Sequence, residues 1–258
     1  MSSCKVAILL ASLVTIGFES KAHDLQQILS HINKDFTSNE QASREIGELA
    51  EDLRSHGDRR GLFPAIYAIT ITAGEEALRR GEFQDPKWTR QLILNYANLY
   101  RRTILKELTG RRDEVPYSWQ LAFEYAQKPD WSPEIDALYG INVHIARDLV
   151  EALFVTTTDF NNSKMRADYY HISDLLRDSM PKISALFNKY PRALRAPAFI
   201  EETVMVNWIA NLRHRAWRKA KVGAQYSERK KIELIQQIDE RAYWQASQYG
   251  LFLPFLGH

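Results

Sequence analysis

The sequence predicts an all-α fold, a single-domain bundle of about nine helices, and three observations support this class. Apolar residues recur at intervals of three and four along most of the chain, which is the period of an α-helix. No segment alternates apolar and polar residues over the length of a strand. Glycine and proline mark the gaps between the periodic segments, and no low-complexity linker separates two domains. With 258 residues, 45% of them hydrophobic, the chain is long enough for one large domain.

Four helices are expected in the first half of the chain, at 24–36, 40–55, 62–80 and 86–108. Each carries an apolar stripe at helical spacing on an otherwise polar surface. A glycine follows each of the last three, at Gly57, Gly81 and Gly110. Pro86 opens the fourth helix at the first helical position, where a backbone N–H is not needed.

The second half is expected to form helices at 117–127, 133–155, 164–190, 197–222 and 227–250. Ser132 and Pro133 are a favourable N-terminus for the second of these, and Pro181 should bend the third. The tail GLFLPFLGH is unusually apolar for a terminus. We expect Phe252, Leu253 and Phe255 to dock onto the bundle, or else to contact a partner or a membrane surface.

Residues 1–22 have the pattern of a secretory signal peptide. Lys5 precedes an apolar run, VAILLASLVTIGF, that is too short to span a bilayer comfortably, and Ser20-Lys21-Ala22 suits a cleavage site. Cleavage after Ala22 would leave 23–258 as a single secreted or periplasmic all-α domain with no stable membrane span. It would also remove Cys4, the only cysteine, and so exclude a cysteine nucleophile, a disulfide and a Cys-ligated metal.

The charge balance argues against a nucleic-acid partner. The chain has 34 basic and 32 acidic residues, a net charge of +2, which produces no strong field for a polyanion. The sequence also lacks a Gly-rich phosphate loop, a G-x-S-x-G turn and an H-E-x-x-H pair. None of these patterns indicates an oligomeric state.

The stretch GINVHIARDL, 140–149, places polar residues inside a long apolar segment. At about 100° per residue, His144 and Asp148 fall on one strip, while Asn142 points into the apolar arc. The strip is either a solvent-exposed face or, because residues at this spacing are neighbours, part of a site for a divalent metal such as zinc. Asn142 is expected to be internal, where it either ties two helices together or contacts a ligand.

Charged residues also lie on the apolar faces of later helices. Asp168 falls within the apolar arc of its helix, with His171 at the border, and Arg213 lies in the middle of another apolar face. A buried guanidinium requires a carboxylate, so we expect Arg213 to pair with Asp168, Asp148 or Asp58. Such a pair either joins two packed helices or borders a polar pocket.

Further inward-facing residues are candidates for ligand contact. Tyr67 and Thr70 lie on the inward face of the helix at 62–80, although Thr70 can also bond back to its own helix. Trp217 shares the inward face of Arg213. Asp58 precedes the helix at 62–80 and is expected to cap it.

Several stretches together resemble a widespread bacterial family of unknown function. They are GDRRGLFPAIYAIT, GEFQDPKW, YSWQLAF, GINVHIARDL, ADYYHISDLL and WIANLRHRAW. Of these, GINVHIARDL is similar to a family core G-(I/V)-N-A-H-I-x-x-D-L, from which this chain departs at Val143. The resemblance covers 58–217 and implies an all-α domain, but no reaction. It also implies a shared polar set, Asp58, Asn142, His144, Asp148, Asp168 and Arg213.

The spacing His144-x-x-x-Asp148 is also similar to part of the zinc site of secreted all-α phospholipase C and P1-type nucleases. Their fuller signature, H-x-x-x-D-x-H-x-P-x-H, is absent from this chain. The similarity is therefore confined to two residues, a spacing that arises commonly by chance.

Two functions follow from these residues, with a structural protein as a third. The first is metal-assisted hydrolysis of a phosphoester-like bond, in which a metal activates water and Arg213 holds an anionic oxygen. Its metal ligands would be His144, Asp148, Asp168 and His171, with Asp58 as a further ligand or base. The second is a helical binding protein for a lipid or other apolar small molecule. The substrate-binding candidates are Tyr67, Thr70, Asn142 and Trp217. The sequence does not decide whether the protein is an enzyme.

Overall fold

A computed structural model describes residues 24–128, 132–189 and 202–252. These residues contain helices and no strands, which confirms the predicted all-α class. A short helix at 24–30 precedes ten α-helices, α2 to α11. The predicted signal peptide at 1–22 and the end of the apolar tail lie outside the described residues.

The first half of the chain follows its local signals closely. It forms α2 (Asn39–Ser55), α3 (Leu62–Arg79), α4 (Pro86–Leu108) and α5 (Tyr117–Ala126), with 3-10 turns at η1 (Arg59–Gly61) and η2 (Arg112–Glu114). Ser38 caps α2 by accepting from the backbone N–H of Gln41 at 3.1 Å. The three glycines after α2, α3 and α4 have φ of 73–75°, a backbone region that favours glycine.

The second half contains one feature that helical periodicity did not predict. The expected helix at 133–155 consists of α6 (Pro133–Val143), a π-helical turn η3 (His144–Asp148) and α7 (Leu149–Thr156). A π-helical turn inside an α-helix is rare and is frequent at functional sites. The π-helical turn lies within GINVHIARDL and contains its polar residues His144, Arg147 and Asp148.

The remaining helices are α8 (Ser163–Asp178), α9 (Met180–Phe187), α10 (Glu202–Gly223) and α11 (Glu228–Phe252). The predicted bend at Pro181 is a break between α8 and α9, with Ser179 between them. Proline supplies no N–H to the preceding turn, which explains a helix end at this position. The predicted start of α10 at Pro197 lies outside the described residues.

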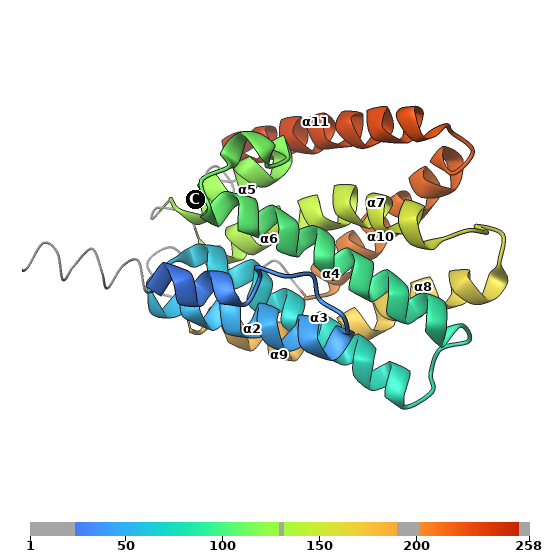
Figure 1. Cartoon of the computed structure of the whole chain (residues 1–258), viewed down its shortest axis with the longest axis horizontal. Helices are drawn as coiled ribbons and strands as arrows, with labels where there is room; N and C mark the ends of the chain where they lie inside the picture. The colour runs from blue at the N-terminus through green and yellow to red at the C-terminus, as the bar shows by residue number, and fades with distance from the viewer. Residues whose placement is uncertain (1–23, 129–131, 190–201, 253–258) are drawn as a thin grey trace, which may run out of the picture.

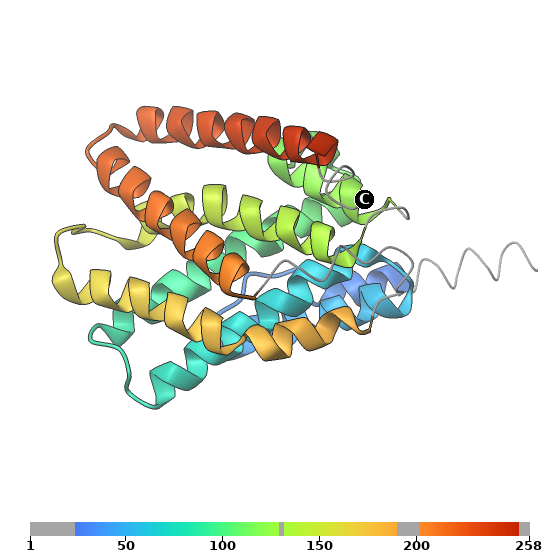
Figure 2. The same cartoon turned by 180° about the vertical axis from the view of Figure 1, so that it is seen from behind.

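The helix formed by α6, η3 and α7 lies in the interior of the bundle. It contacts α3, α4, α5, α10 and α11. Antiparallel α2 and α3 lie on one side (Figure 1), while α11 runs along the opposite edge and diverges from α10 beyond their connecting turn (Figure 2). Because neighbouring helices cover it on several sides, this helix does not have one solvent-exposed face opposite one buried face.

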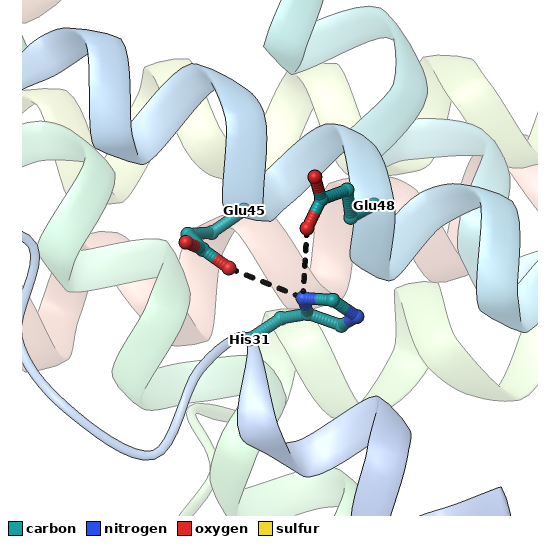
Figure 3. A group of neighbouring side chains, drawn as sticks. All are labelled: His31, Glu45 and Glu48. Carbon is teal, nitrogen blue, oxygen red and sulfur yellow. Dashed lines mark hydrogen bonds and ion pairs between the residues drawn. The ribbon is translucent and has the colours of Figure 1, made fainter.

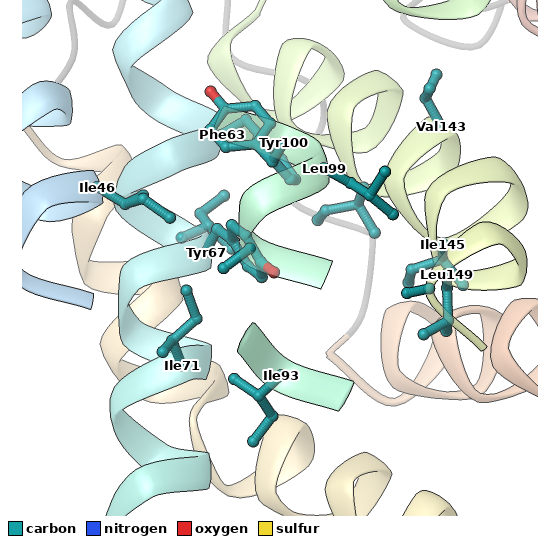
Figure 4. Packing of buried hydrophobic residues seen from close by; sticks show 14 of the residues in the cluster. Ile46, Phe63, Tyr67, Ile71, Ile93, Leu99, Tyr100, Val143, Ile145 and Leu149 are labelled. Atoms are coloured by element: carbon teal, nitrogen blue, oxygen red, sulfur yellow. The ribbon is translucent and has the colours of Figure 1, made fainter. Parts of the chain in front are cut away.

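Apolar packing places α3 against the interior helix and α4. Phe63, Tyr67 and Ile71 follow one another along α3 on the face that packs against Tyr100 and Ile93 of α4 (Figure 4). None of the helices in the described part of the chain is both long and apolar enough to cross a membrane.

Candidate functional site

A buried histidine and aspartate occupy the two ends of the π-helical turn. His144 Nδ1 lies 3.0 Å from Asp148 Oδ2, and the two residues are 3% and 0% exposed. Since a carboxylate only accepts, Nδ1 carries the proton and Nε2 presents its lone pair. Burial lowers the pKa of His144 despite the opposing effect of Asp148, so the imidazole is neutral at pH 7. Its Nε2 is buried and has no partner among the described residues.

Two further donors hold the carboxylate of Asp148. Trp119 Nε1 donates to Oδ2 at 2.8 Å, and Arg147 Nη1 donates to Oδ1 at 2.5 Å. Burial raises the pKa of Asp148, but His144 and Arg147 outweigh it and hold that pKa below its usual value. The carboxylate is therefore ionised, both of its oxygens accept hydrogen bonds, and its charge is balanced by Arg147.

Aromatic rings surround the imidazole of His144. The ring of Tyr96 stacks on it with centroids 3.7 Å apart, and Tyr67 meets it edge-on at 4.4 Å. Burial raises the pKa of Tyr67 and Tyr96 well above the usual value, so both phenols stay protonated. Neither hydroxyl has a hydrogen-bond partner within the described part of the chain. Both can therefore donate to a ligand.

An apolar cavity of about 100 Å³ adjoins these rings. Side chains from α3, α4, α8, α9, α10 and the interior helix line it, and most of them are aliphatic. Its polar lining residues are Tyr67, Thr70, Tyr96, His144, Ser173, Arg177 and Arg213. A mostly apolar cavity with a few converging polar groups is the usual form of a small-molecule site.

Arg213 brings a positive charge to the cavity. The residue is 4% exposed, and its guanidinium lies 4.5 Å from the ring centroid of Tyr169. Its Nε donates to Ser173 Oγ and its Nη2 to the backbone oxygen of Tyr169, each at 2.9 Å. No carboxylate of the described residues forms an ion pair with it. Among the described residues, the cation is therefore held by a ring and by neutral acceptors.

A family model described as a family of unknown function (DUF5995) matches residues 40–249. The chain belongs to this family. The predicted resemblance to a family of unknown function is thus confirmed, whereas its specific core motif and the likeness to zinc nucleases stay predictions. Neither the curated proteins nor the solved structures give a match.

The predicted partner of Arg213 was wrong, because each of the three expected carboxylates is engaged elsewhere. Asp148 pairs with Arg147, and Asp58 accepts from the backbone N–H and the guanidinium of Arg60 at 2.9–3.0 Å. Asp168 accepts from the backbone N–H groups of 84 and 85 at 2.8 and 2.7 Å, immediately before α4. In this DUF5995 chain, Asp58 therefore anchors the turn that follows it, and Asp168 anchors the distant backbone before α4.

The four predicted metal ligands do not assemble into one site. Asp168 is fixed at the start of α4, and His171 lies on the surface, where its Nε2 is 3.1 Å from Glu82 Oε2. Within the described ranges, only one group of three His or carboxylate side chains has its ligand atoms within 4.8 Å of one another, and it contains none of the four. Helical periodicity placed Asp168 and His171 on the correct helix but could not give their depth or partners.

The predicted substrate-binding residues divide in the same way. Tyr67 and Thr70 line the cavity, and Thr70 Oγ1 bonds back to the Tyr67 oxygen at 2.8 Å. Asn142 is only half-buried and is not among the lining residues, although it was expected to be internal. Trp217 is buried against Tyr169 and Phe160, away from the cavity lining.

Sequence reasoning missed Tyr96, Trp119 and the role of Arg147. Tyr96 lies on α4 at helical spacing from the apolar Leu92 and Tyr100, and this spacing places it on the inward face of that helix. Trp119 lies in YSWQLAF, where its polar ring nitrogen signals a buried acceptor. Arg147 lies next to Asp148 in the sequence, but only the three-dimensional structure shows that its guanidinium pairs with the buried carboxylate.

Proposed function

We propose that this protein binds a small apolar carboxylate in the core cavity, with Arg213 as the counter-ion. One observation supports this most directly: a buried guanidinium lines an apolar cavity and has no carboxylate partner among the described residues. A buried charge is costly unless it is paired, and a guanidinium matches a carboxylate in charge and geometry. A ligand carboxylate would supply the missing partner.

Other lining groups support the same ligand class. The protonated hydroxyls of Tyr67 and Tyr96 can donate to carboxylate oxygens, and the aliphatic walls suit a hydrocarbon body. The carboxylate of Asp148 is close enough to affect these tyrosines, but Arg147 already balances its charge. The uncompensated charge at the cavity is therefore positive.

The volume of the cavity limits the size of the ligand. A cavity of about 150 Å³ in another protein accepts benzene, and the present cavity of about 100 Å³ is of the same order. Because the present cavity is the smaller of the two, we expect short-chain acids with a single ring as the upper limit of size, and benzoate is the probe at that limit. Benzamide has the same shape without the charge and serves as the matched control.

The test compares thermal unfolding with benzoate and with benzamide in wild type, Arg213→Met and Arg215→Met. Arg215 is an exposed cation on the same helix and controls for the loss of one charge. We expect benzoate to raise the Tm of wild type and Arg215→Met, with affinity at least about tenfold weaker in Arg213→Met, since a charged hydrogen bond contributes roughly 1.5–3 kcal/mol. Equal shifts with benzamide, or an unchanged response in a folded Arg213→Met, would refute the proposal.

Metal-assisted hydrolysis stays a sequence-based prediction that we do not assign to this cavity, because Asp168 and His171 are engaged elsewhere, apart from the His144–Asp148 pair. We further propose that the protein is exported, as a secreted or periplasmic domain. This second proposal rests on the signal-like pattern of residues 1–22 alone. Comparing the mass of the protein recovered outside the cytoplasm with that expected for 23–258 tests it.

A further inference from the structure

A second polar cluster lies away from the cavity, where the residues that follow the helix at 24–30 meet α2. His31 Nδ1 is 3.1 Å from Glu45 Oε2 and 3.3 Å from Glu48 Oε2 (Figure 3). The three atoms all lie within 4.8 Å of one another. Glu45 and Glu48 are three residues apart on α2, so they share the face that meets His31.

The other ring nitrogen of His31 has a carboxylate partner of its own. Asp52 Oδ2 lies 3.1 Å from Nε2, and Gln27 Nε2 donates to the same carboxylate at 3.2 Å. When Asp52 accepts the Nε2 proton, the Nδ1 lone pair of the neutral ring points at the two glutamates. A carboxylate behind the imidazole is the usual arrangement around a metal-bound histidine, since it fixes the tautomer and raises the basicity of the ligand.

Among the described residues, the centre of the cluster has no hydrogen-bond donor that can serve both glutamate oxygens fully. A protonated His31 offers one N–H at Nδ1, which two glutamate oxygens would have to share. Glu45 Oε1 already accepts from Arg44 at 2.9 Å, which leaves Oε2 directed at the centre. A divalent cation would satisfy all three central atoms at once.

The dimensions fit a metal with short bonds. Zinc binds imidazole nitrogen and carboxylate oxygen at about 2.0–2.2 Å, so ligands at tetrahedral corners lie roughly 3.3–3.6 Å apart. The two separations from Nδ1, 3.1 and 3.3 Å, are close to this value. Side-chain exposure is 14% for His31, 21% for Glu45 and 50% for Glu48, so water can reach the fourth position from the Glu48 side.

We propose that His31, Glu45 and Glu48 form a zinc site, with Asp52 as the residue that positions the imidazole. One imidazole with carboxylates favours zinc over calcium or magnesium, which take oxygen ligands. The ion would join 24–36 to α2. The site is independent of the cavity and of the carboxylate ligand proposed for it.

The test is calorimetric titration of the chelator-treated protein with zinc chloride. We expect saturable binding of one zinc per chain in wild type, its loss in His31→Ala, and about 10–100-fold weaker binding in Asp52→Asn. His56→Ala is the matched control, because His56 is another histidine beside an aspartate, more exposed than His31, with Nε2 3.5 Å from Asp24 Oδ2. Its affinity should equal that of wild type.

Circular dichroism of each variant distinguishes loss of the site from loss of the fold. Glu48→Gln adds a conservative change at the most exposed ligand, and we expect it to weaken zinc binding at least about tenfold while the helical signal stays constant. Calcium chloride at the same concentrations should not compete. The proposal is overturned by the absence of saturable zinc binding in wild type, or by wild-type affinity in a folded His31→Ala. Neither outcome affects the benzoate response.

Discussion

Replacing Asp148 by alanine should destabilise the protein more than any substitution of an exposed charge. The carboxylate is fully buried and accepts from Trp119, His144 and Arg147. Its removal leaves the N–H groups of Trp119 and His144 buried without an acceptor, at about 1–3 kcal/mol each. Arg147 keeps Glu151 at 3.1 Å, so its charge is not isolated. The expected loss is about 3–5 kcal/mol, the range found when one partner of a buried ion pair is removed.

Urea unfolding followed by tryptophan fluorescence measures this loss. In a chain of this size the same loss corresponds to a fall in Tm of roughly 6–20 °C. Asp148→Asn keeps one acceptor and should cost about half as much. Asp174→Ala is the control: Asp174 forms an ion pair with Arg177 at 2.7 Å, both are about half exposed, and its loss should cost under about 0.5 kcal/mol. A cost below about 1 kcal/mol for Asp148→Ala would show that this carboxylate is neither ionised nor isolated from water.

Three further substitutions test other parts of the structure. Gly140→Ala should cost about 1–3 kcal/mol in urea unfolding, because a Cβ there would lie 2.7–3.0 Å from three side-chain atoms of Phe63; a neutral result would mean that Phe63 moves freely. Burial raises the pKa of Asp136 to about 7, against the opposing attraction of Arg59. In the unfolded chain this carboxyl titrates near about 3.9. Between these two pH values the folded state binds more protons than the unfolded state, so the protein loses stability as the pH rises through this window. Asp136→Asn should remove that loss, and parallel stability–pH curves for variant and wild type would contradict it. Asp168→Ala should cost about 2–4 kcal/mol by removing two backbone hydrogen bonds before α4, and hydrogen exchange at residues 84 and 85 should increase; unchanged exchange would argue against this anchor.

The helices were predictable because their signals are local. The stripe of α2, the proline at the start of α4 and the glycines after α2, α3 and α4 each act within a few residues. The positions of Tyr67 and Arg213 on inward faces followed from the same periodicity, and both line the cavity. The π-helical turn was not predictable in this way, because the periodicity assumes a constant rotation per residue. One wider turn changes that rotation and shifts the directions of the side chains around it.

The sequence could not predict which residues of the candidate site pair with one another. The sequence placed Arg213, Asp148, Asp168 and His171 on helices, and by itself it determined the fold class, since helix formation depends on spacing and capping within one segment. Only the tertiary structure decided that Asp148 is balanced by Arg147, that Asp168 holds the start of α4, and that Arg213 faces an apolar cavity. The physical reason is that an ion pair or a cavity depends on the rotation and depth of helices far apart in the chain, which several packed neighbours determine together.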